Sequence, residues 1–185
     1  MLLSDTFESD AVGSIPAGWT SNGLNSVFTT QQQVSHVLNH AGWTGTIQAG
    51  SSTWSNYLYT VAVKPSGWAS EHDGLLFGVR EGGHYSLDIV GGNQLVLEKK
   101  VGSTVTQLAT VSYTFNPALW YNLSIGFPGG SITAYVNGTP VLQANDSTFT
   151  SGAVGIESND PVAFDNVVVT QPGTSAPVGV IIPRK

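Results

Sequence analysis

The sequence predicts an all-β protein, built as an antiparallel sandwich of two sheets. Apolar and polar residues alternate in one short run after another, which is the pattern of strands that bury one face and expose the other. Glycine, proline or asparagine closes the runs, and no long stretch has the spacing of an amphipathic helix. Short strands separated by such turns are typical of β-sandwiches.

The alternation assigns the strands in chain order. Weaker patterns cover residues 34–38 and 44–49, and clear ones cover residues 57–63, 74–80, 84–90, 94–101, 104–114, 119–127, 131–137, 151–157 and 163–170. Glycine-rich turns lie at 81–83, 91–93, 128–130 and 137–138, where tight hairpins require positive φ angles.

Length and composition fit one domain over residues 1–170, followed by a tail at 171–185. A chain of 185 residues is long enough to bury a two-layer core without disulfides or metals. The tail contains prolines around an apolar segment, residues 178–182. It is either a linker or an arm that packs on a neighbouring subunit, and the second interpretation is worth keeping because a free linker is usually polar.

Charge excludes nucleic acid as a partner, and the distribution of apolar residues excludes insertion into a membrane. The chain has a net charge of −6 and only six Lys plus Arg, so it lacks the basic surface that nucleic acid requires. No apolar run is long enough to insert into a membrane, and no signal peptide precedes the first strand. These features fit either a trimmed secreted module or a virion protein, and hence an extracellular or virion-surface location. The absence of cysteine excludes disulfides, thiolate catalysis and Cys-based zinc sites.

Four motifs in the last third of the chain resemble a known family. They are Trp-Tyr-Asn-Leu at 120–123, Tyr-Val-Asn-Gly at 135–138, Gly-Ala-Val-Gly-Ile at 152–156 and Phe-Asp-Asn-Val at 164–167. Their order is similar to the closing half of concanavalin A-like lectin/glucanase jelly rolls, especially levan-binding carbohydrate-binding modules. Residues 4–9 and 15–19 resemble the opening strand and turn of such domains, so the resemblance spans residues 4–170.

The three central strands can be placed in register. If 81–83 and 91–93 are three-residue loops, Arg80 pairs with His84 and Val90 pairs with Gln94. One face, the predicted core, then carries Leu75, Phe77, Val79, Tyr85, Leu87, Ile89, Leu95, Leu97 and Lys99. The opposite face carries Arg80, His84 and Lys100 in one row, Gly78, Ser86 and Glu98 in the next, and Asp88 beside Val96.

The resemblance implies that a sugar binds on the concave face or its rim loops. Carboxylates accept paired hydrogen bonds from vicinal hydroxyls, Arg and Lys donate them, and aromatic rings stack on pyranose faces. The candidate carbohydrate-binding residues are Arg80, His84, Asp88, Glu98, Lys100, Tyr135, Trp43, Trp54 and Trp68. The alternative is a solvated face of ordinary cross-strand charge pairs.

The resemblance also implies a structural calcium ion where the first and last strands meet. Asp165 matches that position by motif, whereas Asp5 and Glu8 match it only by location. The alternative is that Asp165 bonds backbone amides in a turn.

Catalysis is not expected. Hydrolases of this fold carry Glu-x-Asp-x-x-Glu on one strand, but here Gly74-Leu-Leu76 follows Glu71-His-Asp73. Asp88 and Glu98 lie near cations that are expected to hold both ionised, which opposes proton donation. All four histidines are interpreted as structural or surface residues.

The sequence therefore favours a noncatalytic, lectin-like glycan-binding or surface-display module. Its expected partner is a polysaccharide or glycan. One alternative is a structural protein of an assembly, such as a phage head decoration or tail protein that contacts other virion subunits through its C-terminal tail. A second alternative is a glycoside hydrolase-like enzyme.

Overall fold

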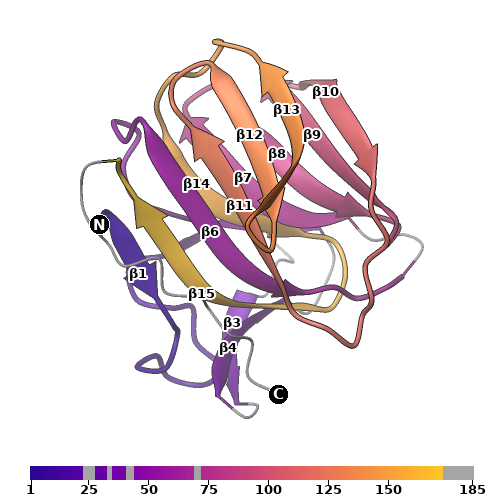
Figure 1. Cartoon of the computed structure of the whole chain (residues 1–185). Helices are drawn as coiled ribbons and strands as arrows, with labels where there is room; N and C mark the ends of the chain where they lie inside the picture. The colour runs from indigo at the N-terminus through magenta and orange to yellow at the C-terminus, as the bar shows by residue number, and fades with distance from the viewer. Residues whose placement is uncertain (23–27, 33–34, 41–43, 69–71, 173–185) are drawn as a thin grey trace.

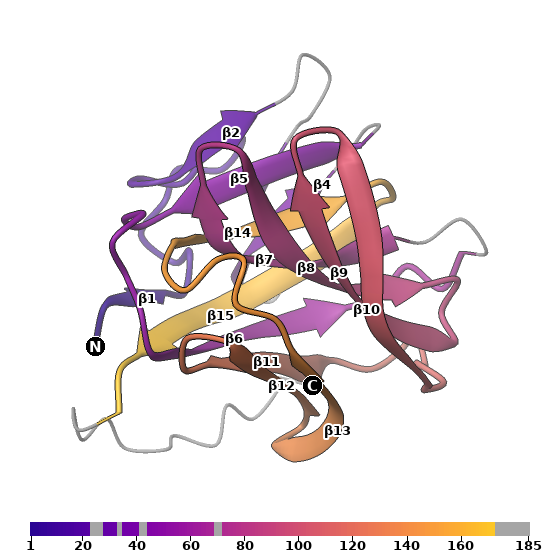
Figure 2. The same ribbon diagram turned by 90° about the horizontal axis from the view of Figure 1, so that it is seen from above.

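The computed structural model describes residues 1–22, 28–32, 35–40, 44–68 and 72–172, and in them two antiparallel sheets pack face to face (Figure 1). The view from above shows the sheets as two layers (Figure 2). The predicted all-β sandwich is confirmed. Within these residues no helix is long and apolar enough to cross a membrane. The apolar segment of the predicted tail lies outside the described residues.

The first sheet has eight strands. Its order is β13-β12-β11-β6-β15-β4-β3, with β1 added on β15. The first and last strands thus lie together, with Leu3 opposite Val169. The strands are β1 (Leu3–Asp5), β3 (Phe28–Gln32), β4 (His36–His40), β6 (Tyr57–Lys64), β11 (Tyr121–Phe127), β12 (Ser131–Val136), β13 (Thr139–Asn145) and β15 (Val162–Thr170).

The second sheet has seven strands in the order β10-β9-β8-β7-β14-β5-β2. Strands β7 to β10 form a meander of hairpins, whereas β14 returns from late in the chain to lie between β7 and β5. The strands are β2 (Thr20–Asn22), β5 (Gly45–Ala49), β7 (His72–Arg80), β8 (Gly83–Val90), β9 (Gln94–Val101), β10 (Thr104–Ser112) and β14 (Ala153–Ser158).

Aromatic side chains fill the space between the sheets. Phe127 lies with its ring centroid 5.3 Å from Tyr57 and 5.4 Å from Phe77, so it joins the two layers. Buried tyrosines also bond across the sandwich: the Tyr57 hydroxyl accepts from Gly78 N at 2.9 Å, and the Tyr59 hydroxyl donates to Gly155 O at 2.8 Å. Satisfying these hydroxyls removes most of the cost of burying them.

The predicted register is confirmed in one hairpin and wrong in the other. Val90 pairs with Gln94 as expected, but Arg80 pairs with Gly83 and not with His84. The cause is a bulge after Phe77, where Gly78 has a φ of 59° and Gly152, just before β14, lies against its backbone.

The residues of β7 before the bulge are displaced by two positions from the predicted register. Leu76, not Gly78, lies opposite Ser86 in the row that also contains Glu98. Val79 is half-buried, unlike the fully covered Leu75 and Phe77 before it.

Most strand bounds agree with the prediction within two residues. Strands β2, β3 and β13 were not predicted. Strand β11 begins at Tyr121 and not at Leu119, because Leu119 N bonds Asn116 O in a turn.

Candidate functional site

Gly74 organises a group of ionisable side chains on the outer face of the seven-stranded sheet. It pairs with Asp88 of β8 on one side and with Glu157 of β14 on the other. A Cβ atom at Gly74 would lie 2.4 Å from Asp88 Oδ1, so only glycine leaves room for that carboxylate. His72 lies two residues earlier on β7, and therefore on the same face.

We call His72, Asp88 and Glu157 the carboxylate cluster. One ligand atom from each lies within 4.8 Å of the others, and His72 Nε2 lies 3.3 Å from Asp88 Oδ2. Asp88 is fully covered, whereas the side chain of His72 is 42% exposed. The cluster is thus buried at Asp88 and open to solvent at His72.

Electrostatics within the cluster favour retained protons. Hydrogen bonding to Asp88 raises the pKa of His72 to about 9, against the opposing effect of burial, and the charges of nearby carboxylates add to the rise. Burial, followed by the charge of Asp88, raises the pKa of Glu157 well above its usual value. At neutral pH we therefore expect His72 to carry a proton, and Glu157 to hold a proton more readily than a free glutamate does.

Burial also raises the pKa of Glu98, with the charge of Asp88 as the next cause. Neighbouring cations alone would lower this pKa, but burial and a second carboxylate outweigh them, so the shift runs in the opposite direction. The pKa of His84 is lowered by burial and then by the charge of Lys100.

A cavity of about 240 Å³ opens over this face. The predicted residues His84, Glu98 and Lys100 line it together with His72 and Glu157 of the cluster. Hydroxyl and amide side chains from Thr44, Ser86, Ser158 and Asn159 add further hydrogen-bonding groups, and Val105 adds an apolar surface. The cavity therefore presents donors, acceptors and one apolar side chain at a single site.

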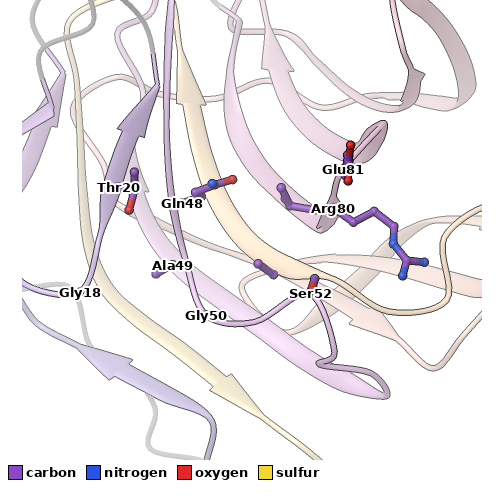
Figure 3. A pocket seen from close by; sticks show the side chains of 10 residues that line it. Gly18, Thr20, Gln48, Ala49, Gly50, Ser52, Arg80 and Glu81 are labelled. Atoms are coloured by element: carbon purple, nitrogen blue, oxygen red, sulfur yellow. The ribbon is translucent and has the colours of Figure 1, made fainter.

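Arg80 lies at a different site. It lines a second cavity of about 460 Å³ with Glu81, Gln48, Thr20 and Ser52 (Figure 3). The guanidinium extends away from Gln48 and Thr20. The bulge at Gly78 and the resulting pairing with Gly83 explain why Arg80 is not beside His84.

The predicted aromatic platform is not assembled at either cavity. Trp54 packs against the core and over Gly50, and its carbonyl accepts from Gly152 N at 2.8 Å. Trp68 is 56% exposed in the loop after β6, outside both cavities. Tyr135 lies on β12 of the other sheet. Trp43 lies outside the described residues.

The residues of the predicted calcium site lie near the β1–β15 pair. Asp5 Oδ1 accepts from Phe7 N at 2.8 Å and Asp5 Oδ2 accepts from Trp19 Nε1 at 2.7 Å. Asp165 Oδ1 accepts from Asn166 N at 2.6 Å, and Glu8 Oε2 accepts from His36 N at 3.4 Å. Both Asp5 oxygens thus have donors, and calcium there stays a prediction.

Sequence reasoning missed His72 and Glu157. His72 was interpreted as structural, and Glu157 was placed on a strand with no neighbour assigned. The signal that could have found them is Gly74, a glycine inside β7, because a glycine within a strand indicates a close approach by a neighbouring group.

Comparisons with solved structures establish the fold. The carbohydrate-binding module CBM66 from Bacillus subtilis superposes with a TM-score of 0.72 at 19% identity, covering 83% of this chain and 96% of that one. A Bacillus subtilis protein of unknown function with a galectin-like fold superposes with a TM-score of 0.73 at 14% identity. The superposition covers 92% of this chain and 95% of that one. The fold is a concanavalin A-like jelly roll.

The same fold carries enzymes. The beta-glucanase of Bacillus licheniformis superposes with a TM-score of 0.67 at 12% identity, covering 91% of this chain and 97% of that one. No family model and no curated protein matches the sequence. The resemblance seen in the sequence is thus confirmed at the level of the fold, and the function has to be argued from the site.

Proposed function

We propose that the protein is a noncatalytic glycan-binding module whose sugar lies in the cavity over the carboxylate cluster. The observation that carries the proposal is the cavity itself, which gathers charged, hydroxyl and amide side chains from several strands. Sugar hydroxyls both donate and accept hydrogen bonds, and a site with both kinds of partner suits them.

Each kind of contact is available at the cavity. Lys100 can donate to sugar oxygens, while Glu98 and Ser86 can accept from hydroxyls. Val105, 53% exposed, offers an apolar surface to the C–H groups of a sugar ring. The neighbours described as a carbohydrate-binding module and a galectin agree with this use of the fold.

The burial of Asp88 supports binding without catalysis. Retaining hydrolysis needs two carboxyl groups that flank the scissile bond about 5 Å apart. Asp88 and Glu157 are close enough to each other, but Asp88 is fully covered and cannot contact a sugar carbon. We therefore expect no release of reducing ends from beta-glucans, fructans or galactans.

Neutralising a carboxylate that lines the cavity should weaken glycan binding. In calorimetry against fructans, beta-glucans and galactans, Glu98→Gln should cost about 1 to 3 kcal/mol of binding free energy, because it replaces a charge-assisted hydrogen bond with a weaker one. Its melting temperature should barely change, since Glu98 is only partly buried.

Arg80→Ala is the matched control, because Arg80 lines the other cavity. If Arg80→Ala abolishes binding while Glu98→Gln does not, the sugar site is the larger cavity at the end of β7. If the parent binds none of these glycans at millimolar concentration, the lectin-like function is lost and an assembly role replaces it.

A further inference from the structure

We propose that His72, Asp88 and Glu157 bind a divalent transition-metal ion, for which Zn²⁺ is the best match. In the described part of the chain, this is the only group of three such side chains whose ligand atoms lie within 4.8 Å of one another. The proposal goes beyond glycan binding, since the ion would bind without a sugar.

Asp88 gives independent support for a ligand here. Its side chain is 0% exposed, and no donor among the described residues outside the cluster bonds either carboxylate oxygen. A buried carboxylate is costly unless it is paired or coordinates a metal. The Oδ2 atom lies 3.3 Å from His72 Nε2, so the pairing of this buried carboxylate is made within the cluster itself.

The spacing of the ligand atoms fits a small ion. Zinc bonds of about 2.0 to 2.1 Å in tetrahedral geometry place neighbouring ligand atoms about 3.3 Å apart. His72 Nε2 and Asp88 Oδ2 already have that separation, and a carboxylate oxygen of Glu157 lies within 4.8 Å of the other two ligand atoms.

The backbone holds the three ligands in place. They come from three adjacent strands, because β7 lies between β8 and β14. Gly74 lies between the two carboxylates in the register, and its missing side chain leaves the space into which Asp88 projects. Ligands on strands are positioned better than ligands on loops.

The ligand types select the ion. One imidazole nitrogen with two carboxylate oxygens suits zinc, whereas calcium prefers six to eight oxygens. Three protein ligands leave a fourth position, which would face the cavity that His72 and Glu157 line. Binding would displace the protons that His72 and Glu157 hold, after which the two carboxylates balance the charge of the ion.

Metal titration of the full chain tests the proposal. We expect ZnCl₂, added to metal-stripped protein without sugar, to bind with one site per chain and to raise the melting temperature, since a ligand of the folded state stabilises it by mass action. Ca²⁺ at the same concentration should have little effect. Cobalt(II) should give the visible absorption of a four-coordinate N/O site.

Substitutions separate this site from other acidic groups. Asp88→Asn and His72→Gln should each weaken Zn²⁺ affinity at least 30-fold, and His72→Gln is the safer variant because the side chain is half-exposed. Two controls, Glu98→Gln in the same cavity and Asp165→Asn near β1, should change the affinity less than threefold.

Three results would overturn the proposal. They are no saturable Zn²⁺ binding below millimolar concentration, unchanged affinity in His72→Gln, or loss of affinity in Asp165→Asn instead. None of them bears on glycan binding, which is measured separately with Glu98→Gln.

Discussion

Replacing Gly74 with alanine should lower the free energy of unfolding by at least about 3 kcal/mol. The added Cβ would lie 2.1 Å from the carbonyl oxygen of Leu87 and 2.8 Å from the Cα of Asp88. Both are backbone atoms of the neighbouring strand, so no side-chain rotation relieves the overlap. Strand β7 would have to move away from β8, and the ladder between them would weaken. Urea denaturation followed by tryptophan fluorescence measures the loss.

Gly126→Ala is the matched control for this substitution. Gly126 also lies inside a strand, but the nearest atom to its added Cβ would be Tyr135 Cε2 at 3.6 Å, which is an ordinary contact. Alanine there should change stability by less than about 1 kcal/mol, because it also reduces the entropy of the unfolded chain. Equal losses at the two positions would show that the close packing around Gly74 is not what limits the substitution.

The strands from Tyr57 onward, except β13, could be predicted because the alternation of apolar and polar residues shows which face of each strand is buried. Leu87 and Leu97 pair across β8 and β9 and are both fully covered, as the register of that hairpin implies. Side-chain alternation with a period of two assigns every residue of such a strand to one of its two faces. The outward positions of His84, Glu98 and Lys100 followed in the same way.

The neighbours of β14 could not be predicted in this way. Its pairing with β7 joins residues far apart in sequence, and alternation within a strand carries no information about which strand lies beside it. One of the three residues of the carboxylate cluster depends on that pairing, since it brings Glu157 to Gly74. The bulge at Gly78 was missed for a related reason, because the close approach of Gly152 requires the same distant strand.

Lys99 shows that the sequence can place a residue on the buried face without identifying its partner there. The register placed it on the buried face among apolar side chains, where a charged group needs a partner. The partner is Asp146, just after β13, whose carboxylate oxygen lies 2.5 Å from Lys99 Nζ. Since β13 belongs to the opposite sheet, the sequence alone could not identify this pair.

Removing the Asp146 carboxylate should cost about 3 kcal/mol of stability at neutral pH. Asp146 accepts from Lys99, from the Tyr85 hydroxyl at 2.7 Å and from Thr148 N at 2.9 Å, so it ties the seven-stranded sheet to the end of β13. Asp146→Ala leaves the partly buried ammonium of Lys99 without its carboxylate partner. Asp10→Ala is the control, because Asp10 Oδ1 accepts one hydrogen bond, from Ala17 N at 2.9 Å, in an exposed loop. This substitution should lower the free energy of unfolding by no more than about 1 kcal/mol.

The cost of Asp146→Ala should shrink in acid. Burial alone would raise the pKa of Asp146, but the hydrogen bonds from Lys99, Thr148 and Tyr85 outweigh it and lower the pKa well below the ordinary value of 3.8. A depressed pKa means that the stabilisation is complete above pH 3.8 and is lost as the pH falls below it. Urea denaturation of parent and variant from about pH 6 to pH 2.5 measures the difference, in which the titration of Glu98 and Glu157 largely cancels because both proteins carry them. A difference that stays constant over this range would show that Asp146 stabilises the fold through packing and not through its charge.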